Sequence, residues 1–489
     1  MAGPSASSTV SGIAISAPGR WRRRLLTVAA GLLWLAVLAA ARAWWAGSPA
    51  PDAPKLPPHL GIVLHVLMAP ALAAVCWAYL RLWFEPPPAE ARRQVLAWSL
   101  GLAAVAALAL PLTSNDVFSY LAYGRMMHLG LDPGRWGPAV LPLGDPFRAL
   151  VSHDWVESPS VYGPVSLAIF WLSTVSGAVW PSLLLYKLLS LVTAWLVIVT
   201  AYRTCEATLP EARIPAALVM TIANPLLLWE VAGQGHNDGL MVAFAFVAVA
   251  LVYRRRGTWS AFSLFVGMLV KSAVAPALFF VAAWRLPRLR GRYYAAACLA
   301  GAALAGLALQ VTPGLLLTIN APLREADVAT RLFNSVPALL YYAAGLAGPA
   351  AALGAYRIYW TLSVAGVAAF VIHAGRRTET PQDVVEHSLR ALLLIVIVFS
   401  PNVQPWYFLW MLPFAAHSES EALRGLVVFA SAGVLLLYAA PLALPTWLLA
   451  SGLWLSLLTV MSLEPGVAPA AVRALTRSRR ATEAPRAQA

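Results

Sequence analysis

Long apolar segments separated by short polar loops run along almost the whole chain. The segments are about 18–24 residues long, enough for an α-helix to cross roughly 30 Å of hydrocarbon. A membrane β-barrel would instead show ~10-residue segments of alternating polarity. The pattern therefore predicts an all-α polytopic membrane protein. The candidate segments lie near residues 25–46, 60–83, 94–112, 162–179, 182–202, 214–232, 238–253, 258–284, 293–311, 335–347, 355–374, 388–401, 405–417, 422–440 and 444–462.

Three of these segments are too short or too broken for a single crossing each. They are residues 162–179, 258–284 and 335–347, and counting them as full spans would place arginine-rich loops on both sides of the membrane. Residues 258–284 contain Lys271 and Pro276 and are expected to form a broken or re-entrant pair, because non-helical backbone at membrane depth is tolerated where it lines a cavity. About 12–14 transmembrane helices remain.

Composition supports the membrane assignment. Of the 489 residues, 60% are hydrophobic and 11% are charged, whereas a soluble domain carries about 25% charged residues. We expect a cytoplasmic disordered N-terminus (1–24), one transmembrane domain (25–462) and a basic cytoplasmic tail (463–489). A cleaved signal peptide would have a shorter apolar core than residues 25–45. Cys76, Cys205 and Cys298 lie far apart and show neither metal-ligand spacing nor a disulfide framework.

The net charge of +14 comes from arginines in short loops. Such clusters mark cytoplasmic loops under the positive-inside rule, which argues against a nucleic-acid partner and for contact with membrane lipids. Both termini are then cytoplasmic, and a cell-membrane location with extracytoplasmic loops at 113–161, 233–238, 312–334 and 401–405 follows. The clusters are Arg20 with Arg22–Arg24, Arg92 with Arg93, Arg254–Arg256, Arg285–Arg292, Arg376 with Arg377, and the tail arginines.

Asp116 follows directly on the uncharged run 95–112 and opens the longest polar stretch within the hydrophobic part of the chain. A carboxylate at the rim of a membrane helix is costly unless it has a partner or a function. The alternative is a simple N-cap of a short helix. In a helix, Asp116, Tyr120 and Tyr123 share one face, and a short amphipathic helix on the membrane surface would leave Arg125 available to an anion.

A second polar group ends the span 214–232. Pro225 is expected to break this helix, and Glu230, His236 and Asp238 gather after the break. A solvated turn rich in Asn, Asp and Gly is the alternative. His236 and Asp238 could also bind a metal, but no third ligand is evident.

Two basic residues are candidates for binding a phosphate. Lys271 lies inside an apolar segment, where a lysine normally faces a cavity or an anion, or else extends its ammonium to the interface. Arg331 lies in the loop 312–334, on the side that disfavours arginine, although a solvated helix face is equally compatible.

Gln404, Trp406 and Tyr407 lie between two apolar segments. Aromatic rings beside an amide suit a sugar, which presents an apolar face and hydroxyl groups. An interfacial aromatic belt is the alternative.

These motifs together resemble the polyprenol-phosphate-mannose-dependent mannosyltransferases of the GT-C superfamily, especially bacterial α-1,6-mannosyltransferases, over roughly residues 90–415. The resemblance implies a GT-C-like fold whose long first extracytoplasmic loop carries short amphipathic helices and the essential carboxylate. Asp116 would be the general base. The substrate-binding residues would be Tyr120, Tyr123, Arg125, Tyr162, Glu230, His236, Asn237, Asp238, Lys271, Arg331, Gln404, Trp406 and Tyr407.

The resemblance implies an inverting hexosyltransferase of the cell envelope. It would move a hexose, with mannose favoured, from a polyprenyl-phosphate donor to a glycolipid or glycan acceptor, with no cofactor and no divalent metal. A transporter or flippase of a lipid-linked sugar would share such binding groups but should show internal symmetry and polar residues on both sides. No internal repeat is evident. A ligand-binding membrane sensor is a third alternative, but no attached signalling domain supports it.

Overall fold

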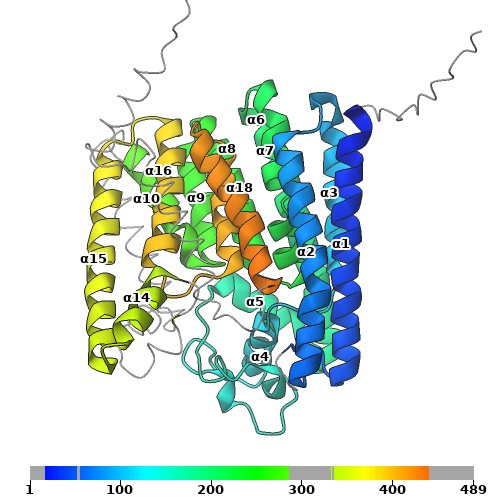
Figure 1. Ribbon diagram of the computed structural model, residues 1–489. Coiled ribbons are helices and arrows are strands. Elements are labelled where there is room, and N and C mark those ends of the chain that lie inside the picture. Colours follow the sequence, from blue (N-terminus) through cyan, green and yellow to red (C-terminus); the bar gives the residue numbers. More distant parts are fainter. Residues whose placement is uncertain (1–16, 52–55, 286–331, 333–334, 440–489) are drawn as a thin grey trace, which may run out of the picture.

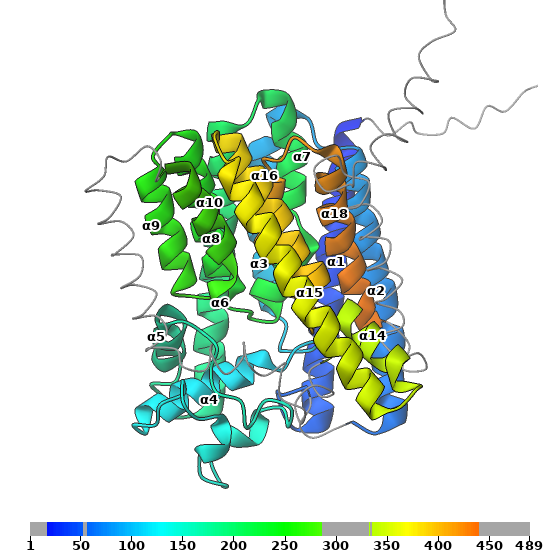
Figure 2. The same ribbon diagram turned by 90° about the vertical axis from the view of Figure 1, so that its left-hand side faces the viewer.

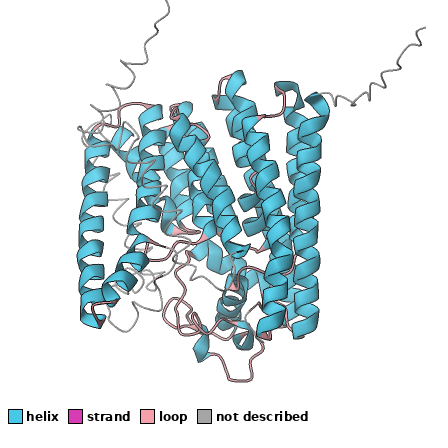
Figure 3. Cartoon of the chain, in the orientation of Figure 1, coloured by secondary structure: helices cyan, strands magenta, loops and turns pink. Residues whose placement is uncertain are grey.

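The computed structural model describes residues 17–51, 56–285, 332 and 335–439, and these form a bundle of helices with a loop layer at one end (Figures 1 and 3). No β-strand occurs in this described part of the chain. The α-helices are α1 (Ala17–Ala46), α2 (Pro58–Phe84), α3 (Arg92–Ala107), α4 (Asp116–His128), α5 (Pro164–Ser173), α6 (Val179–Thr208), α7 (Ile214–Thr221), α8 (Asp238–Tyr253), α9 (Gly257–Met268), α10 (Ala275–Arg285), α14 (Val336–Gly345), α15 (Pro349–Arg376), α16 (Pro381–Leu394), α17 (Leu412–Ala415) and α18 (Glu421–Leu436). The π-helices are η5 (Leu227–Gly233) and η10 (Ile395–Phe399). The short 3-10 helices are η1 (Ala89–Ala91), η2 (Pro138–Val140), η3 (Arg148–Leu150), η4 (Glu211–Arg213), η6 (Ser272–Val274), η11 (Pro405–Met411) and η12 (Leu437–Ala439).

The protein is an all-α polytopic membrane protein. Within the described residues, four helices are long and apolar enough to cross a membrane: Gly19–Ala46, His59–Phe84, Val179–Thr208 and Pro349–Arg376. Helix α1 begins at Ala17, so residues 17–24, expected in a disordered N-terminus, are helical; residues 1–16 and the tail 463–489 lie outside the described part.

Several apolar segments are interrupted as the sequence predicts. Helix α7 ends at Thr221, and helical structure resumes at Pro225, whose missing N–H is tolerated in a first turn. Helices α9 and α10 form a hairpin interrupted around Lys271, since a Cβ at Gly257, at the start of α9, would touch the Arg285 side chain at the end of α10. Helices α5 and α14 have 10 residues each and are too short to cross alone.

The two ends of the bundle differ in their polar groups. One end, here called the basic end, joins arginine-bearing loops from distant parts of the chain. Its contacts include Arg24–Glu85 (2.5 Å), Arg92–Glu206 (3.2 Å), Arg213 to the Ser418 carbonyl (2.5 Å) and Tyr253–Gln382 (2.6 Å). The other end, here called the site end, carries α4, α5 and the loop 113–161 below the bundle (Figures 1 and 2).

Helix α4 is not the surface helix that the sequence suggests. Nine of its 13 residues are buried. The chain after α4 folds over it, because Tyr123 donates to the Ser158 carbonyl at 2.8 Å and Asn115 donates to the Leu150 carbonyl at 3.2 Å. The loop therefore encloses α4 between itself and α5 and fixes the position of Asp116.

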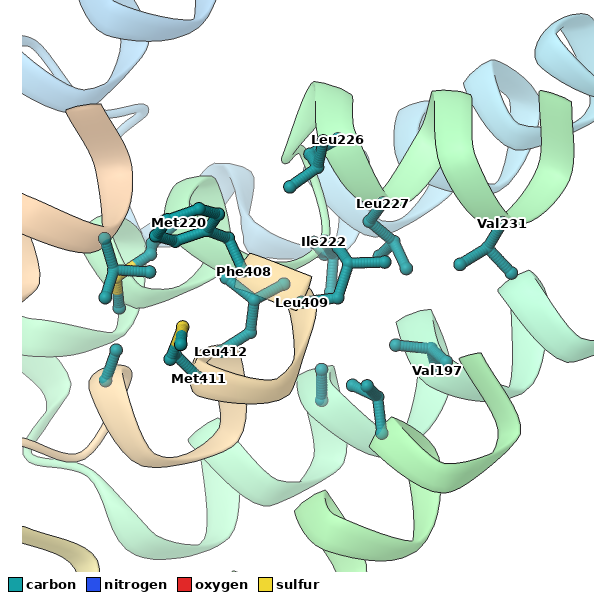
Figure 4. Close-up of a cluster of buried hydrophobic side chains, with 14 of the residues drawn as sticks. Val197, Met220, Ile222, Leu226, Leu227, Val231, Phe408, Leu409, Met411 and Leu412 are labelled. Carbon is teal, nitrogen blue, oxygen red and sulfur yellow. The ribbon is translucent and has the colours of Figure 1, made fainter. Parts of the chain in front are cut away.

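A packed apolar cluster holds the broken segments in place. Side chains from α6, α7, η5, η11 and α17, and from the segment between α7 and η5, interlock there (Figure 4). Because close-packed interiors resist displacement, this cluster gives the polar turns that follow η5 and precede η11 a rigid support. Its labelled members are Val197, Met220, Ile222, Leu226, Leu227, Val231, Phe408, Leu409, Met411 and Leu412.

Candidate functional site

Asp116 is the first residue of α4 and lies at the site end of the bundle. Asn115, the residue before the helix, makes no side-chain capping hydrogen bond. The Asp116 carboxylate is 22% exposed; its Oδ2 lies 3.6 Å from His236 Nδ1 and accepts from the Tyr120 hydroxyl at 3.4 Å. These contacts go beyond a helix cap and connect Asp116 to a segment more than 100 residues away.

Three ionisable groups form a row that runs from the protein surface into the core. Asp116 is its exposed end, the His236 imidazole its middle, and the Glu230 carboxyl its inner end, with 3.3 Å between His236 Nε2 and Glu230 Oε2. The side chains of His236 and Glu230 are completely buried. The Trp406 ring stacks on the imidazole with centroids 3.6 Å apart and so fixes its plane. We call Asp116, His236 and Glu230 the carboxylate–histidine row.

Burial also sets the protonation of His236 within the row and of its neighbour Tyr120. Burial, with a smaller contribution from the Lys271 ammonium, holds the pKa of the His236 imidazole well below its ordinary value, so this ring is neutral at pH 7. Burial, reinforced by the Tyr162 phenol and by the Asp116 carboxylate, raises the pKa of Tyr120 well above its ordinary value. Tyr120 therefore keeps its proton and remains a donor to Asp116.

The second polar unit pairs Asp238 with Lys271. The Lys271 Nζ lies 2.8 and 3.1 Å from the two Asp238 oxygens, and the Trp410 indole donates to Asp238 Oδ1 at 2.6 Å. The Asp238 side chain is completely buried and that of Lys271 is 14% exposed. The rings of Tyr162, Tyr407 and Trp410 lie 5.3–5.8 Å from the ammonium, within range of cation–π attraction.

The turn that presents His236 is fastened on both sides. Lys187 of α6 donates to the carbonyls of Ala232 (2.7 Å) and Gly233, at the end of the π-helix η5. Gln234 Oε1 accepts from the backbone N–H groups of Leu112 (2.7 Å) and Thr113 (2.8 Å), which joins the turn to the chain entering α4. A glycine at 235 is required by its φ of +82°. Single π-turns often occur at functional sites.

The other predicted residues occupy different places around this centre. Tyr162 donates to Tyr120 at 3.4 Å, and Asn237 donates to Ser166 at 3.1 Å beside a small cavity lined by α5 and α6. Tyr407 stacks on Trp410 with centroids 4.3 Å apart, and Gln404 precedes η11.

Two of the residues predicted to bind substrate contact the loop 113–161 instead of the centre of the site, and a third lies outside the described residues. Arg125 pairs with the buried Asp145 at 3.0 Å, so its anion is a side chain of this protein. Tyr123 bonds the Ser158 carbonyl. Arg331, like most of the loop 312–334, lies outside the described residues. Over the described residues, no group of three or more His, Cys, Asp or Glu side chains is arranged to hold a metal ion.

Comparison with known proteins decides the family. The profile of a family described as "Alpha-(1->6)-mannopyranosyltransferase, N-terminal domain" matches residues 24–287, more than half of the chain. The chain belongs to this family. The match begins near the start of the described helices, so the first two helices, which the sequence resemblance left out, are part of what the family shares.

Curated relatives agree with this assignment. The chain is 35% identical over 179 residues (35% of either chain) to alpha-(1->6)-mannopyranosyltransferase A of Corynebacterium glutamicum. It is 28% identical over 348 residues (63% of this chain, 62% of the relative) to the Mycobacterium tuberculosis protein of the same name. It is 26% identical over 374 residues (69% and 61%) to alpha-(1->6)-mannopyranosyltransferase B of Corynebacterium glutamicum. The matches thus span between 35% and 62% of these relatives' own length. No solved structure matches the chain.

In this member of the family, three residues of the candidate site escaped the sequence analysis. Lys187 is the one lysine of the apolar segment 182–202. A lysine within a membrane segment could have indicated a functional role from the sequence alone. Trp410 and Gln234 gave no comparable signal, since a tryptophan in an apolar segment and a glutamine in a turn are both common. Their roles become visible only through their bonds to Asp238 and to the backbone before α4.

Proposed function

We propose that this protein is an inverting mannosyltransferase that moves mannose from a polyprenyl-phosphate donor to a glycolipid or glycan acceptor. Membership in the family, and relatives named as alpha-(1->6)-mannopyranosyltransferases, support the mannosyl transfer. The observation that carries the proposal is the Asp116 carboxylate, which is the exposed end of an otherwise buried row of ionisable groups. Perturbed and buried ionisable groups gather at active sites.

Asp116 is the general base of the proposed reaction. As the acceptor oxygen attacks C1 of mannose, its hydroxyl proton moves to the Asp116 carboxylate, and the bond between C1 and the phosphate oxygen breaks. The polyprenyl phosphate leaves with the electron pair. General-base action of this kind contributes about 10²–10⁴-fold. Attack from the face opposite the phosphate converts a β-linked donor into an α-linked product, in accord with the linkage in the relatives' names.

Lys271 is the group proposed to stabilise the departing phosphate. An ammonium has three N–H donors, and Asp238 accounts for two contacts of the Lys271 Nζ. The partly exposed ammonium keeps a donor for the phosphate, and a fixed cation at a developing negative charge lowers the barrier. The completely buried Asp238 acts through Lys271 in this scheme. Arg331 stays a candidate for the same role.

The aromatic and amide groups would hold the sugars. Tyr407 offers its ring near Lys271, and Gln404 and Trp406 lie three residues and one residue before Tyr407 in the chain; one face of the Trp406 ring covers His236. Asn237 borders the small cavity beside the carboxylate–histidine row, and Tyr162 donates to Tyr120, the neighbour of the base. Tyr123 and Arg125 would contribute indirectly, by holding the loop 113–161 in place.

The site is proposed to face the extracytoplasmic side of the cell membrane, with both termini in the cytoplasm. The arginine-bearing loops gather at the opposite end of the bundle, and cytoplasmic loops are enriched in Lys and Arg.

The test is a transfer assay with the purified protein in lipid. Radiolabelled polyprenyl-phosphate mannose and candidate mannoside acceptors are supplied from outside, and the anomeric configuration of the product is determined. The proposal expects an α-linked product, formed equally well with and without a metal chelator. A β-linked product would refute the inverting mechanism. Movement of the labelled lipid across the vesicle membrane, without any transfer of mannose to the acceptor, would favour a transporter of a lipid-linked sugar instead.

A further inference from the structure

Glu230 is the least explained residue of the carboxylate–histidine row. It lies in the π-helix η5 with its side chain completely buried, and the His236 imidazole separates it from the base Asp116. The His236 imidazole and the Tyr438 hydroxyl are the polar groups that face it. This burial keeps Glu230 away from a substrate, so an effect on the reaction has to pass through a neighbour, and His236 is the one that also contacts Asp116.

The position of Glu230 relative to His236 is fixed by the backbone. The His236 N–H donates to the Glu230 carbonyl at 2.9 Å, which closes the turn after η5. Trp406 stacks on the ring and holds its plane, with Nε2 3.3 Å from Glu230 Oε2 and Nδ1 3.6 Å from Asp116 Oδ2. Each ring nitrogen of His236 therefore faces one carboxyl group.

The free energy of burial decides where the negative charge of the row lies. A charge taken out of water without a close cation is strongly disfavoured. The two lysines near the row already have partners: Lys271 is bonded to Asp238, and Lys187 donates to the carbonyls of Ala232 and Gly233. The exposed Asp116 can keep its charge, whereas Glu230 at the buried end holds a proton.

We propose that Glu230 is a positioning residue that sets the tautomer of His236: its carboxylic acid donates to Nε2, and the imidazole hydrogen is thereby placed on Nδ1, facing the base Asp116. The inference rests on the proposed function, in which Asp116 takes the acceptor proton. In a neutral imidazole one nitrogen donates and the other accepts, so the partner of one nitrogen determines what the other can do.

The tautomer matters for the orientation of the base. With hydrogen on Nδ1, His236 and Tyr120 both direct a donor at the same oxygen, Asp116 Oδ2, over 3.6 and 3.4 Å. Both hydrogens then attract the same carboxylate oxygen, which favours one orientation of the base. With hydrogen on Nε2, the Nδ1 lone pair would face the carboxylate, and the Tyr120 hydroxyl, 3.5 Å from Nδ1, would be drawn away from Asp116 to donate to that nitrogen. Other ionisable groups also lie near the row: Tyr162, Tyr186, Tyr438, Asp238 and Lys271.

Two substitutions at one position separate this role from others. Glu230→Gln keeps an N–H donor for Nε2, whereas Glu230→Met has a similar shape and no donor. We expect kcat of Glu230→Gln to stay within about threefold of wild type. Glu230→Met should lose roughly 10–100-fold in kcat with little change in KM, as is typical when the group orienting a histidine is removed. Equal losses in both variants, or none in Glu230→Met, would overturn the proposal.

A spectroscopic measurement tests the tautomer without any substrate. In the protein with ¹⁵N-labelled histidine, solid-state NMR distinguishes hydrogen on Nδ1 from hydrogen on Nε2, and the His236 signal is identified by its loss in His236→Gln. We expect hydrogen on Nδ1 in wild type and in Glu230→Gln. Hydrogen on Nε2 in wild type would overturn the proposal even if transfer is observed. Conversely, no transfer with the Nδ1 tautomer present would refute the proposed function while leaving the role of Glu230 intact.

Discussion

Two completely buried histidines lie at opposite ends of the bundle, His236 at the site end and His417 at the basic end. His417 Nδ1 lies 2.8 Å from the Pro413 carbonyl, which can only accept, so Nδ1 carries a hydrogen, and Nε2 lies 2.8 Å from the Thr208 hydroxyl. Neither partner of His417 can ionise in the working pH range. His236 instead has a carboxyl group at each nitrogen.

The difference separates a structural histidine from a functional one. The partners of His417 fix one protonation pattern, and the residue joins α6 to the loop before α18. The partners of His236 can exchange protons, so its hydrogen-bonding pattern depends on its neighbours. Burial alone therefore does not tell a structural histidine from a functional one, because both residues are buried. The chemistry of the groups that contact the ring distinguishes the two.

The largest loss of transfer is expected when the negative charge of the base at the site end is removed. Asp116→Asn keeps the shape of the side chain and cannot accept the acceptor proton, so transfer should fall by about 10²–10⁴-fold. Initial rates are measured in the assay described above. Asp154→Asn is the matched control, because Asp154 lies in the same loop with its side chain 75% exposed, and it should keep full activity. Undiminished transfer by a folded Asp116→Asn protein would exclude Asp116 as the base.

The second-largest effect is expected for the ion pair beside the row. Asp238→Asn leaves the Lys271 ammonium largely buried without its carboxylate, and breaking such a pair costs about 3–5 kcal/mol. The loss is measured as lower stability to denaturant in detergent micelles. Asp132→Asn is the matched control, since the Asp132–Arg135 pair is solvent-exposed (51% and 73%) and its loss should cost less than about 1 kcal/mol. Similar losses in both variants would mean that the Lys271 pair is effectively hydrated.

Part of the fold and of the site follows from the sequence alone. Charged groups inside apolar segments are costly, so Asp116 and Lys271 signalled a polar centre. Pro225 predicted the break between α7 and η5. The expected gathering of Asp116, His236, Asp238 and Trp406 at one end is what the structure shows.

The pairing of these groups could not be predicted. Residues six apart in an α-helix are rotated by about 240°, onto different faces, so the contact of Glu230 with His236 exists only because of the π-helix and the turn after it. The Arg125–Asp145 pair depends on how the loop after α4 folds back, and that fold leaves no periodic signal. Local patterns show which residues need partners, and tertiary structure chooses the partners.

A loss of folding stability of intermediate size is expected when the pH is lowered. Burial lowers the pKa of His417 to about 4, below the ordinary value of about 6.5. Between these values the unfolded chain binds a proton that the folded protein does not, so stability is lost as the pH falls from about 6.5 towards 4. At pH 5 this loss amounts to about 2 kcal/mol for one histidine.

His417→Gln tests this contribution. The variant should be less stable than wild type at pH 7.5, and the difference should shrink by about 2 kcal/mol by pH 5, because the variant no longer has this proton-linked loss. Denaturant unfolding at the two pH values measures the change. Its kcat at pH 7.5 should equal that of wild type, since His417 lies at the far end from the base. Parallel stability profiles would show that His417 is protonated or hydrated in the folded protein.

The smallest effect is expected at the surface of the basic end. Glu211 pairs with Arg92 at 3.3 Å, but its side chain is 77% exposed, and Arg92 has a second partner in Glu206 at 3.2 Å. Exposed pairs contribute about 0–1 kcal/mol, and salt screens what remains. Glu211→Gln should therefore change stability by less than about 0.5 kcal/mol, with no difference from wild type in 0.5 M salt and with unchanged transfer. A larger, salt-resistant loss would mean that the charges of the basic end hold the helices together as firmly as the buried pair of the site end does.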